Sequence, residues 1–260
     1  ALAFDVPVVD HCEDLHLAEG GCMNEGTIST ELGLPGMPAA AEDVMVARNV
    51  ALAELTGARL HLAHISTVGS VRMVREAKSR GLKVTAEACP HHFTITEEVV
   101  RGYNTYAKMN PPLRTWKDVQ AIKEGLRDGT IDVIATDHAP HATQEKQLGF
   151  TEAPFGIVGL ETALPLTFAL VDEGILSLEA AIDRLSTAPA KVFGLSKGTL
   201  TVGVDADVVI VDQQEQWEVD PAKFRSKSRN TPFAGWKVKG RVTTTIVGGR
   251  VVFEAGVGEP

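Results

Sequence analysis

Short apolar runs alternate along most of the chain with segments whose apolar residues recur at helical spacing. The apolar runs, which are typical of buried strands, span residues 7–11, 59–66, 83–90 and 131–138. The segments with a helical period span residues 41–57, 68–81, 116–129 and, despite Pro165, 159–174. Because strands and helices follow one another in this order, the pattern predicts an α/β protein with a parallel sheet and helical crossovers.

The predicted strands are too few for a closed barrel. An eight-stranded α/β barrel takes roughly 250 residues by itself, whereas the pattern here gives four strands and changes near residue 197. We therefore predict that residues 1–196 form the C-terminal half of a (β/α)8 barrel of the TIM type. The opening residues ALAFDVPVVDH lack an initiator Met and begin almost within a strand, so we expect the first half to precede this sequence.

Residues 197–260 follow a different pattern. Apolar and polar positions alternate over residues 198–212. Residues 243–256 are typical of a hairpin that turns at Gly248–Gly249. We predict a small all-β module in this part of the chain.

Composition and charge argue against several function classes. The chain has 260 residues, 44% of them hydrophobic, which is enough for one large domain with or without a small companion. Its net charge of −9 argues against nucleic-acid binding and against a polybasic membrane patch. No apolar run reaches the roughly 18 residues that a membrane span needs. Three cysteines (Cys12, Cys22 and Cys89) without a CxxC pair favour a reducing cytoplasm, and we expect free, buried thiols.

Ionisable residues gather where the predicted strands end. His11, His64 and Asp137 close three different strands, and α/β proteins build their sites at the carboxyl ends of parallel strands. His61 and His64 are three residues apart, so they are expected on opposite faces of a strand. We choose His64, which is nearer the carboxyl end, and expect His61 to be packed or hydrogen-bonded behind the barrel.

Two imidazoles and a carboxylate on one rim suit Zn²⁺, which accepts nitrogen and oxygen ligands. A catalytic zinc keeps one position open for water and lowers the pKa of that water towards 7. A carboxylate beside the water takes its proton and hands it to a leaving group, a role that we assign to Asp137. A purely structural role is the competing interpretation for each histidine alone, and three such groups at one edge weaken it.

Two loops are candidates for holding an anionic substrate. Asn110 lies in MNPPLR, where two prolines stiffen the chain, although a simple turn explains this motif as well. Gly156 and Gly159 precede a predicted helix, where free backbone N–H groups can bind a carboxylate. His141 lies four residues past Asp137, on the loop over the same mouth.

Other polar residues near these motifs have less definite roles. His91 and His92 either support the site or are structural, and the sequence favours neither role. Glu13 and Asp14 are expected to cap the following segment, and we assign them no catalytic role.

Five motifs, in chain order, resemble one known family: DHCED, LAHIST, KMNPPLR, ATDHAPH and PFGIVGLET. They resemble the class I bacterial dihydroorotases of the amidohydrolase superfamily, and ATDHAPH is the most specific of them. The tail from GTLTVGVDADVVIVD to KSRNTPFAGWKVKGRV resembles the β-sandwich of that superfamily. The resemblance covers nearly the whole chain and implies that residues 197–260 are the C-terminal part of a β-sandwich domain.

The resemblance implies a (β/α)8 barrel with zinc at its carboxyl-terminal mouth. The implied reaction is the reversible cyclisation of N-carbamoyl-L-aspartate to L-dihydroorotate, in pyrimidine biosynthesis. The implied zinc ligands are His11, His64 and Asp137, of which Asp137 is also the acid/base. The implied substrate contacts are Asn110, His141 and the backbone of Phe155 and Gly156.

One motif of that family does not occur in this sequence. The family's first barrel strand carries an HxH pair that binds metal, followed by an Arg that binds the substrate carboxylate. This sequence contains no HxH, so we expect that pair in a preceding segment and leave open whether one or two zinc ions bind. The resemblance also implies a cytoplasmic homo-oligomer that binds a small-molecule substrate, and it is compatible with association with aspartate carbamoyltransferase.

Two alternatives stay open at this point. A hydantoinase or allantoinase uses the same chemistry on a ring without a carboxylate. A non-catalytic dihydroorotase-like scaffold for aspartate carbamoyltransferase is expected to have lost metal ligands, and the retained His11, His64 and Asp137 argue against it.

Overall fold

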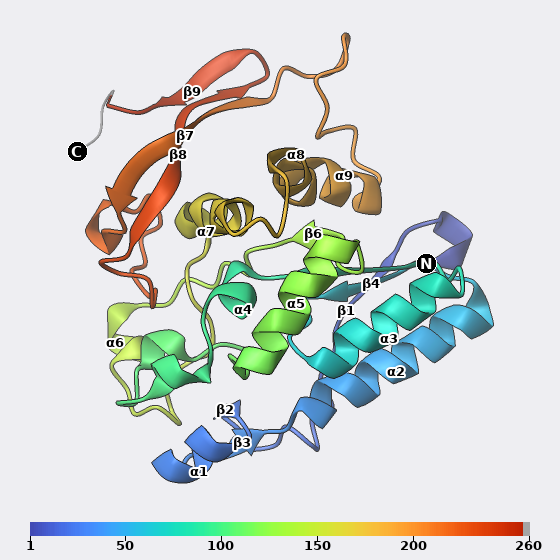
Figure 1. The fold of residues 1–260 in the computed structure, drawn as a ribbon, viewed down its shortest axis with the longest axis vertical. Helices are drawn as coiled ribbons and strands as arrows, with labels where there is room; N and C mark the ends of the chain where they lie inside the picture. The colour runs from blue at the N-terminus through green and yellow to red at the C-terminus, as the bar shows by residue number, and fades with distance from the viewer. Residues whose placement is uncertain (257–260) are drawn as a thin grey trace.

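The predicted parallel sheet is present in the computed structural model, which describes residues 1–256 (Figure 1). Its four strands lie in the order β1-β4-β5-β6: β1 (Val8–His11), β4 (Leu60–Ala63), β5 (Val84–Ala88) and β6 (Val133–Ile134). The strand predicted over 131–138 is shorter than expected. Ile134 pairs with Ala88, the last residue of β5, and an isolated parallel bridge between His138 and Ile157 follows further along the chain.

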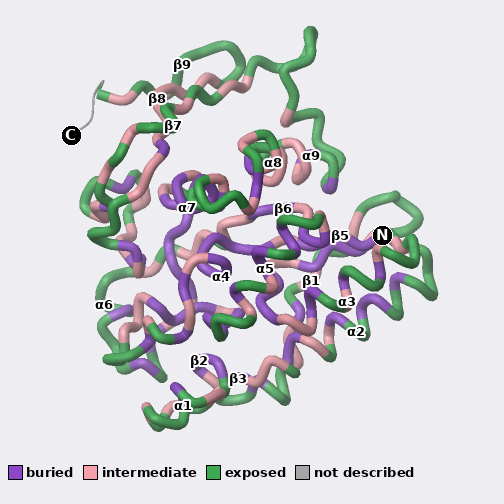
Figure 2. Tube along the Cα trace, in the orientation of Figure 1, coloured by how far each residue is buried: buried purple, intermediate pink, exposed green. Residues whose placement is uncertain are grey.

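The four predicted helices are also present. They are α2 (Ala39–Thr56), α3 (Val68–Ser79), α5 (Trp116–Asp128) and α7 (Leu160–Asp172). The first three pack side by side along the parallel sheet, and α7 lies between that sheet and the C-terminal strands (Figure 1). Leu62 and Ala86 of the sheet are fully buried, so the apolar periods of strands and helices meet in one core (Figure 2). Within residues 1–256, no helix is both long and apolar enough to span a bilayer.

Short elements that the periodicity did not predict fill the connections. The α-helices are α1 (Thr27–Leu32), α4 (Pro90–Thr94), α6 (Thr143–Lys146), α8 (Leu178–Ile182) and α9 (Ala188–Phe193), with a π-helical turn at Asp183–Thr187. The 3-10 turns are Leu2–Phe4, Glu97–Val100, Thr105–Ala107 and Pro221–Lys223, and β2 (Met23–Asn24) pairs with β3 (Gly36–Met37). None of them exceeds six residues, so none carries a full hydrophobic period.

The C-terminal part forms one antiparallel sheet of β7 (Val208–Glu218), β8 (Lys237–Val247) and β9 (Arg250–Glu254). The predicted hairpin at Gly248–Gly249 is confirmed, since it joins β8 to β9. The alternation over 198–207 does not form a strand. Lys197 instead binds the carboxylates of Asp205 and Asp207 at 2.7 and 2.6 Å, which folds this exposed segment on itself.

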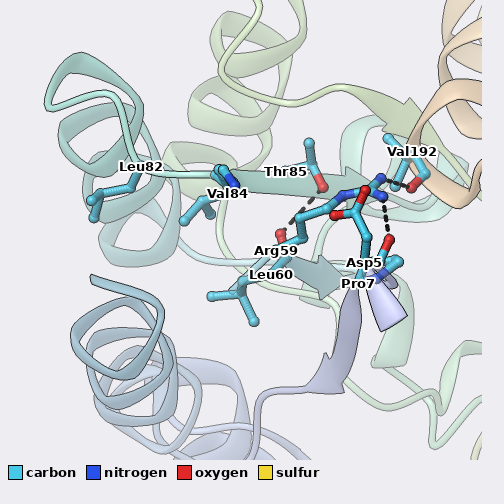
Figure 3. A pocket seen from close by; sticks show the side chains of 9 residues that line it. Asp5, Pro7, Arg59, Leu60, Leu82, Val84, Thr85 and Val192 are labelled. Atoms are coloured by element: carbon cyan, nitrogen blue, oxygen red, sulfur yellow. Dashed lines mark hydrogen bonds between the residues drawn. The ribbon is translucent and has the colours of Figure 1, made fainter. Parts of the chain in front are cut away.

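A cavity of about 290 Å³ lies where the strands of the parallel sheet begin (Figure 3). Arg59 crosses it and donates to the backbone oxygens of Asp5, at 2.9 Å, and Val192, at 2.5 Å. These bonds tie the first residues of the chain to α9. The cavity lies at the opposite end of the strands from the predicted site residues, so we assign it a structural role.

The sheet core yields a first prediction. Replacing Leu62, which is fully buried on β4, by Ala should lower the free energy of unfolding by about 2–5 kcal/mol, because it removes buried methyl groups and leaves a cavity. Leu55→Ala, at a residue that is 81% exposed on α2, should change it by less than about 0.5 kcal/mol. Urea denaturation of both variants measures the difference, and equal effects would contradict the described core.

Candidate functional site

Two of the predicted zinc ligands face each other. Nδ1 of His11 lies 3.2 Å from Nε2 of His64, and the two rings meet edge to face. The other ring nitrogen of His11 lies 3.3 Å from the carboxylate of Glu13, which accepts hydrogen bonds and does not donate them. The proton of the His11 ring therefore belongs on Nε2, and Nδ1 presents its lone pair to His64.

This pair fits a zinc ion. Zn–N bonds of about 2.0–2.1 Å in a tetrahedral site imply a separation of about 3.3 Å between two ligand nitrogens, and the observed separation is 3.2 Å. Burial and the neighbouring His11 lower the pKa of His64, while the Asp137 carboxylate acts in the opposite direction. His64 is thus neutral near pH 7, as a metal ligand has to be. Its second nitrogen, Nδ1, is buried and finds no hydrogen-bond partner in the part of the chain that the structure describes.

The two histidines reach this position by different routes. His11 is the last residue of β1. β4 ends at Ala63, and His64 adopts a φ of +32°, outside the strand conformation. Positive φ is uncommon for residues other than glycine, and it is often found at functional positions. The turn at residue 64 directs this side chain towards His11.

Strand parity therefore does not separate His61 from His64, contrary to our expectation. His61 lies in register beside Val9, so it shares the face of the sheet that carries His11 and does not lie behind it. The expected hydrogen bonding of His61 is confirmed, because its ring contacts the Glu87 carboxylate at 3.0 Å. Parity fails because the backbone leaves the strand conformation at His64.

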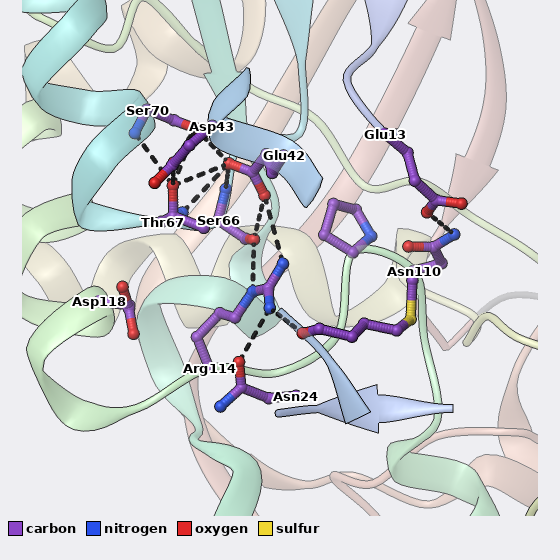
Figure 4. Close-up of polar contacts among 12 residues, drawn as sticks. Glu13, Asn24, Glu42, Asp43, Ser66, Thr67, Ser70, Asn110, Arg114 and Asp118 are labelled. Atoms are coloured by element: carbon purple, nitrogen blue, oxygen red, sulfur yellow. Dashed lines mark hydrogen bonds and ion pairs between the residues drawn. The ribbon is translucent and has the colours of Figure 1, made fainter. Parts of the chain in front are cut away.

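A buried polar network holds the turn that follows β4 (Figure 4). Glu42, in the first turn of α2, accepts hydrogen bonds from the backbone N–H groups of Ser66 at 2.8 Å and Thr67 at 3.2 Å. Its carboxylate lies 3.8 Å from the guanidinium of Arg114, and both side chains are only 3% exposed. Arg114 also donates to the Ser66 hydroxyl at 3.1 Å. The network joins the turn after His64 to the loop that contains Asn110.

Glu13 is a residue that sequence reasoning assigned to capping only. One oxygen of its carboxylate accepts from Nδ2 of Asn110 at 2.6 Å and lies 3.3 Å from His11. Glu13 thus links a candidate zinc ligand to a candidate substrate residue. The side-chain carbonyl oxygen of Asn110 is buried and accepts no hydrogen bond from any of the described residues 1–256. Proximity to the strand-end His11 was the only signal in the sequence, because Glu13 lies beyond the end of β1, where strand parity does not apply.

The loop of His141 packs against Phe155–Gly156. Nε2 of His141 donates to the backbone oxygen of Phe155 at 2.7 Å. Gly156 has a φ of +113°, and a Cβ there would lie 2.4 Å from Cβ of Ala139, so only glycine fits. Asn230, which we did not predict, donates to the backbone oxygens of Ala139 at 2.9 Å and Gly156 at 3.1 Å. A single Asn in a polar segment carries no spacing signal.

Asp137 lies just beyond β6 and is exposed. Like His64, it has a positive φ, +45°, so two of the four such non-glycine residues within 1–256 are predicted ligands. Its charge acts on His64, but its carboxylate does not join the close histidine pair. Within residues 1–256, only Cys89, His91 and His92 place three potential ligand atoms within 4.8 Å of one another.

That group of Cys89, His91 and His92 is buried at the end of β5 and the start of α4. The free, buried state expected for all three cysteines of the chain is confirmed. Burial lowers the pKa of His92 to about 3 and that of His91 well below its usual range, and it raises the pKa of the Cys89 thiol. All three groups are neutral near pH 7.

An α/β fold whose parallel strands bring two imidazole nitrogens to zinc-ligand spacing defines a candidate metallohydrolase. Residues 3–252 match the model of the amidohydrolase family, and the chain belongs to that family. It is 54% identical over 254 residues to a dihydroorotase from Syntrophus aciditrophicus and 57% identical over 256 residues to one from Geobacter sp. strain M21. These alignments cover 98% of this chain, which spans about 60% of the length of either relative.

Solved structures share the fold at lower identity. Dihydropyrimidinase from Brevibacillus agri has a TM-score of 0.86 at 28% identity, over 97% of this chain and 57% of that one. L-hydantoinase from Arthrobacter aurescens has a TM-score of 0.86 at 32% identity, over 97% of this chain and 58% of that one. The parallel sheet and the small antiparallel sheet thus form an α/β amidohydrolase fold like that of hydantoinases.

The contacts of Glu13 generate a second prediction. Glu13→Gln should weaken zinc binding by about 10–100-fold, because a carboxylate that orients a ligand histidine contributes about that much. Glu19→Gln, at an exposed position of the same loop, should leave zinc affinity unchanged. Competition with a chromophoric chelator measures both variants. Equal affinities would contradict an orienting role for Glu13.

Burial of neutral His92 predicts a loss of stability in acid. The unfolded side chain takes up a proton below about pH 6.5, whereas the folded one stays neutral until about pH 3. The free energy of unfolding should therefore fall between pH 7 and pH 5, with about 2 kcal/mol of the loss due to His92. Urea denaturation of the metal-free protein should show a smaller loss for His92→Gln and an unchanged loss for exposed His16→Gln. Equal losses in all three proteins would disprove the assignment.

Proposed function

We propose that this chain is part of a dihydroorotase, which interconverts N-carbamoyl-L-aspartate and L-dihydroorotate in pyrimidine biosynthesis. The observation that carries the proposal is the zinc-like spacing of His11 and His64 at the carboxyl edge of the parallel sheet. Identity of 53–58% to the dihydroorotases compared supports this substrate class. Residues 1–196 would form the C-terminal half of a (β/α)8 barrel, and residues 197–260 the C-terminal part of a β-sandwich.

His11 and His64 would hold one zinc ion, with Asp137 as a further ligand. When bound, zinc activates water and polarises the amide carbonyl. In the hydrolytic direction, a C–O bond forms from water and the ring C–N bond breaks. Asp137 takes the proton of the water and delivers it to the leaving ring nitrogen. In the cyclisation direction, Asp137 takes the proton from the attacking nitrogen and returns it to the leaving oxygen, which departs as water.

Two loops would bind the substrate. The carbonyl oxygen of Asn110 has no hydrogen-bond partner among residues 1–256, so it is an acceptor for a ring N–H, while one N–H of its amide donates to Glu13. The loop of Phe155 and Gly156, with His141 beside it, would hold the substrate carboxylate; the N–H of Gly156 itself donates to the backbone oxygen of Lys108 at 2.9 Å. Nε2 of His141 donates to the backbone oxygen of Phe155, so only the doubly protonated imidazolium offers a second N–H, on Nδ1, to this carboxylate. Asn230 would keep the two loops together.

The cellular context belongs to the same proposal. The enzyme would be a cytoplasmic homo-oligomer that acts on a small molecule, with aspartate carbamoyltransferase as the candidate protein partner. A non-catalytic scaffold is disfavoured. It does not require the positive φ of His64 or the zinc-like spacing between Nδ1 of His11 and Nε2 of His64.

A hydantoinase is the second candidate, because dihydropyrimidinases and hydantoinases share the fold at a TM-score of up to 0.86. Dihydroorotate, hydantoin and dihydrouracil distinguish the two candidates, since only dihydroorotate carries a carboxylate on its ring. We expect turnover of dihydroorotate and slow or no turnover of the other two. The reverse preference would replace dihydroorotase by hydantoinase.

The proton shuttle gives a further prediction, to be tested in the full-length protein. Asp137→Asn should lower kcat by at least about 10²–10⁴-fold, because Asn cannot carry the proton. Its circular dichroism and thermal midpoint should stay unchanged, since the side chain is exposed. Asp205→Asn, in the exposed segment beside Lys197, is the matched control and should retain activity. Near-normal turnover by Asp137→Asn would remove this residue from the mechanism.

A further inference from the structure

Cys89, His91 and His92 form a compact group that the proposed reaction does not use. Cys89 is 0% exposed, His91 3% and His92 4%. One ligand atom of each lies within 4.8 Å of the other two. Three polar groups gathered in an apolar core lose solvation, so their grouping needs a compensating partner.

The hydrogen bonds of His92 point to the nature of that partner. Nε2 of His92 donates to the backbone oxygen of Pro111 at 3.0 Å, which leaves the ring lone pair on Nδ1. Nδ1 is buried and has no hydrogen-bond partner among residues 1–256. Histidines that bind metal commonly donate their other ring N–H to a backbone carbonyl in this way. The lone pair on Nδ1 is therefore available to bind a metal ion.

We propose that Cys89, His91 and His92 bind a second metal ion of the zinc class, next to the His11–His64 pair and distinct from it. One sulfur and two imidazole nitrogens are ligands that Zn²⁺ prefers. Binding forms a bond between the Cys89 thiolate and the metal and releases the thiol proton to solvent, with no change of oxidation state. Ligand atoms in a tetrahedral zinc site lie about 3.3–3.8 Å apart, so small side-chain rotations close the gap from 4.8 Å.

The position of the group suggests what this ion does. Cys89 follows β5, and His91 and His92 lie in α4, which has only five residues. His92 also contacts Pro111, the neighbour of Asn110. An ion here would fix the end of β5 to the loop that carries a candidate substrate residue. Its role is therefore to position that loop, and it needs no contact with the substrate.

Cobalt substitution of the purified full-length protein tests the site. We expect the thiolate-to-cobalt charge-transfer band of a sulfur ligand in wild type and in Cys22→Ser. Cys22 is the control, because it is also a free, buried cysteine and lies outside the group. Cys89→Ser should lose the band and bind about one metal equivalent fewer. A wild type without the band, or a band that survives in Cys89→Ser, would overturn the proposal.

X-ray absorption on unmodified, zinc-loaded protein provides a test that needs no variant to fold. A sulfur neighbour at about 2.3 Å from zinc supports the site, whereas only nitrogen and oxygen neighbours overturn it. This inference stands apart from the proposed function. Zinc–sulfur bonding without turnover of dihydroorotate would support the second site and contradict the dihydroorotase assignment. Turnover of dihydroorotate without zinc–sulfur bonding would support the assignment and contradict the second site.

Discussion

Glu42 and Arg114 form a buried ion pair below the carboxyl edge of the parallel sheet, and the candidate site depends on it. Burying two charges costs several kcal/mol per ion unless their hydrogen-bonding capacity is filled. Here the backbone of Ser66 and Thr67 donates to the carboxylate, and Asn24 accepts from the guanidinium. Loss of either partner would leave an unpaired buried charge, at about 3–5 kcal/mol.

The ion pair constrains the site from two directions. On one side it fixes the turn directly after His64, whose positive φ needs external support. On the other side it fixes the loop that begins at Asn110 and ends at Arg114. Glu13 connects the two sides, since its carboxylate contacts both His11 and Asn110. The candidate metal ligands and the candidate substrate loop are therefore held by one hydrogen-bonded network, in which no single strand sets the geometry.

Both candidate metal positions follow from where strands stop. β4 stops before His64 and β5 before Cys89, and the chain after each strand is free to turn its polar side chains inwards. The apolar face packed against α2, α3 and α5 stays regular because burial of Leu62 and Ala86 requires it. The sheet is stable because its apolar face is regular, and it can carry polar side chains because the chain leaves the strand conformation at its carboxyl edge.

The sequence by itself determined the order of strands and helices, the four parallel strands and the hairpin at Gly248–Gly249. These features follow from local hydrophobic periods and turn residues, which act over neighbouring positions. It also identified His11 and His64 as candidate ligands, although the parity argument used to choose His64 was wrong. Only the tertiary structure brought Glu13 to His11 and Asn230 to Gly156, because each contact depends on where separate segments are packed. The backbone turn at His64 was likewise decided by Glu42, 22 residues earlier in the chain. A local sequence pattern cannot predict such a hydrogen bond, because its donor and acceptor meet only after the sheet has formed.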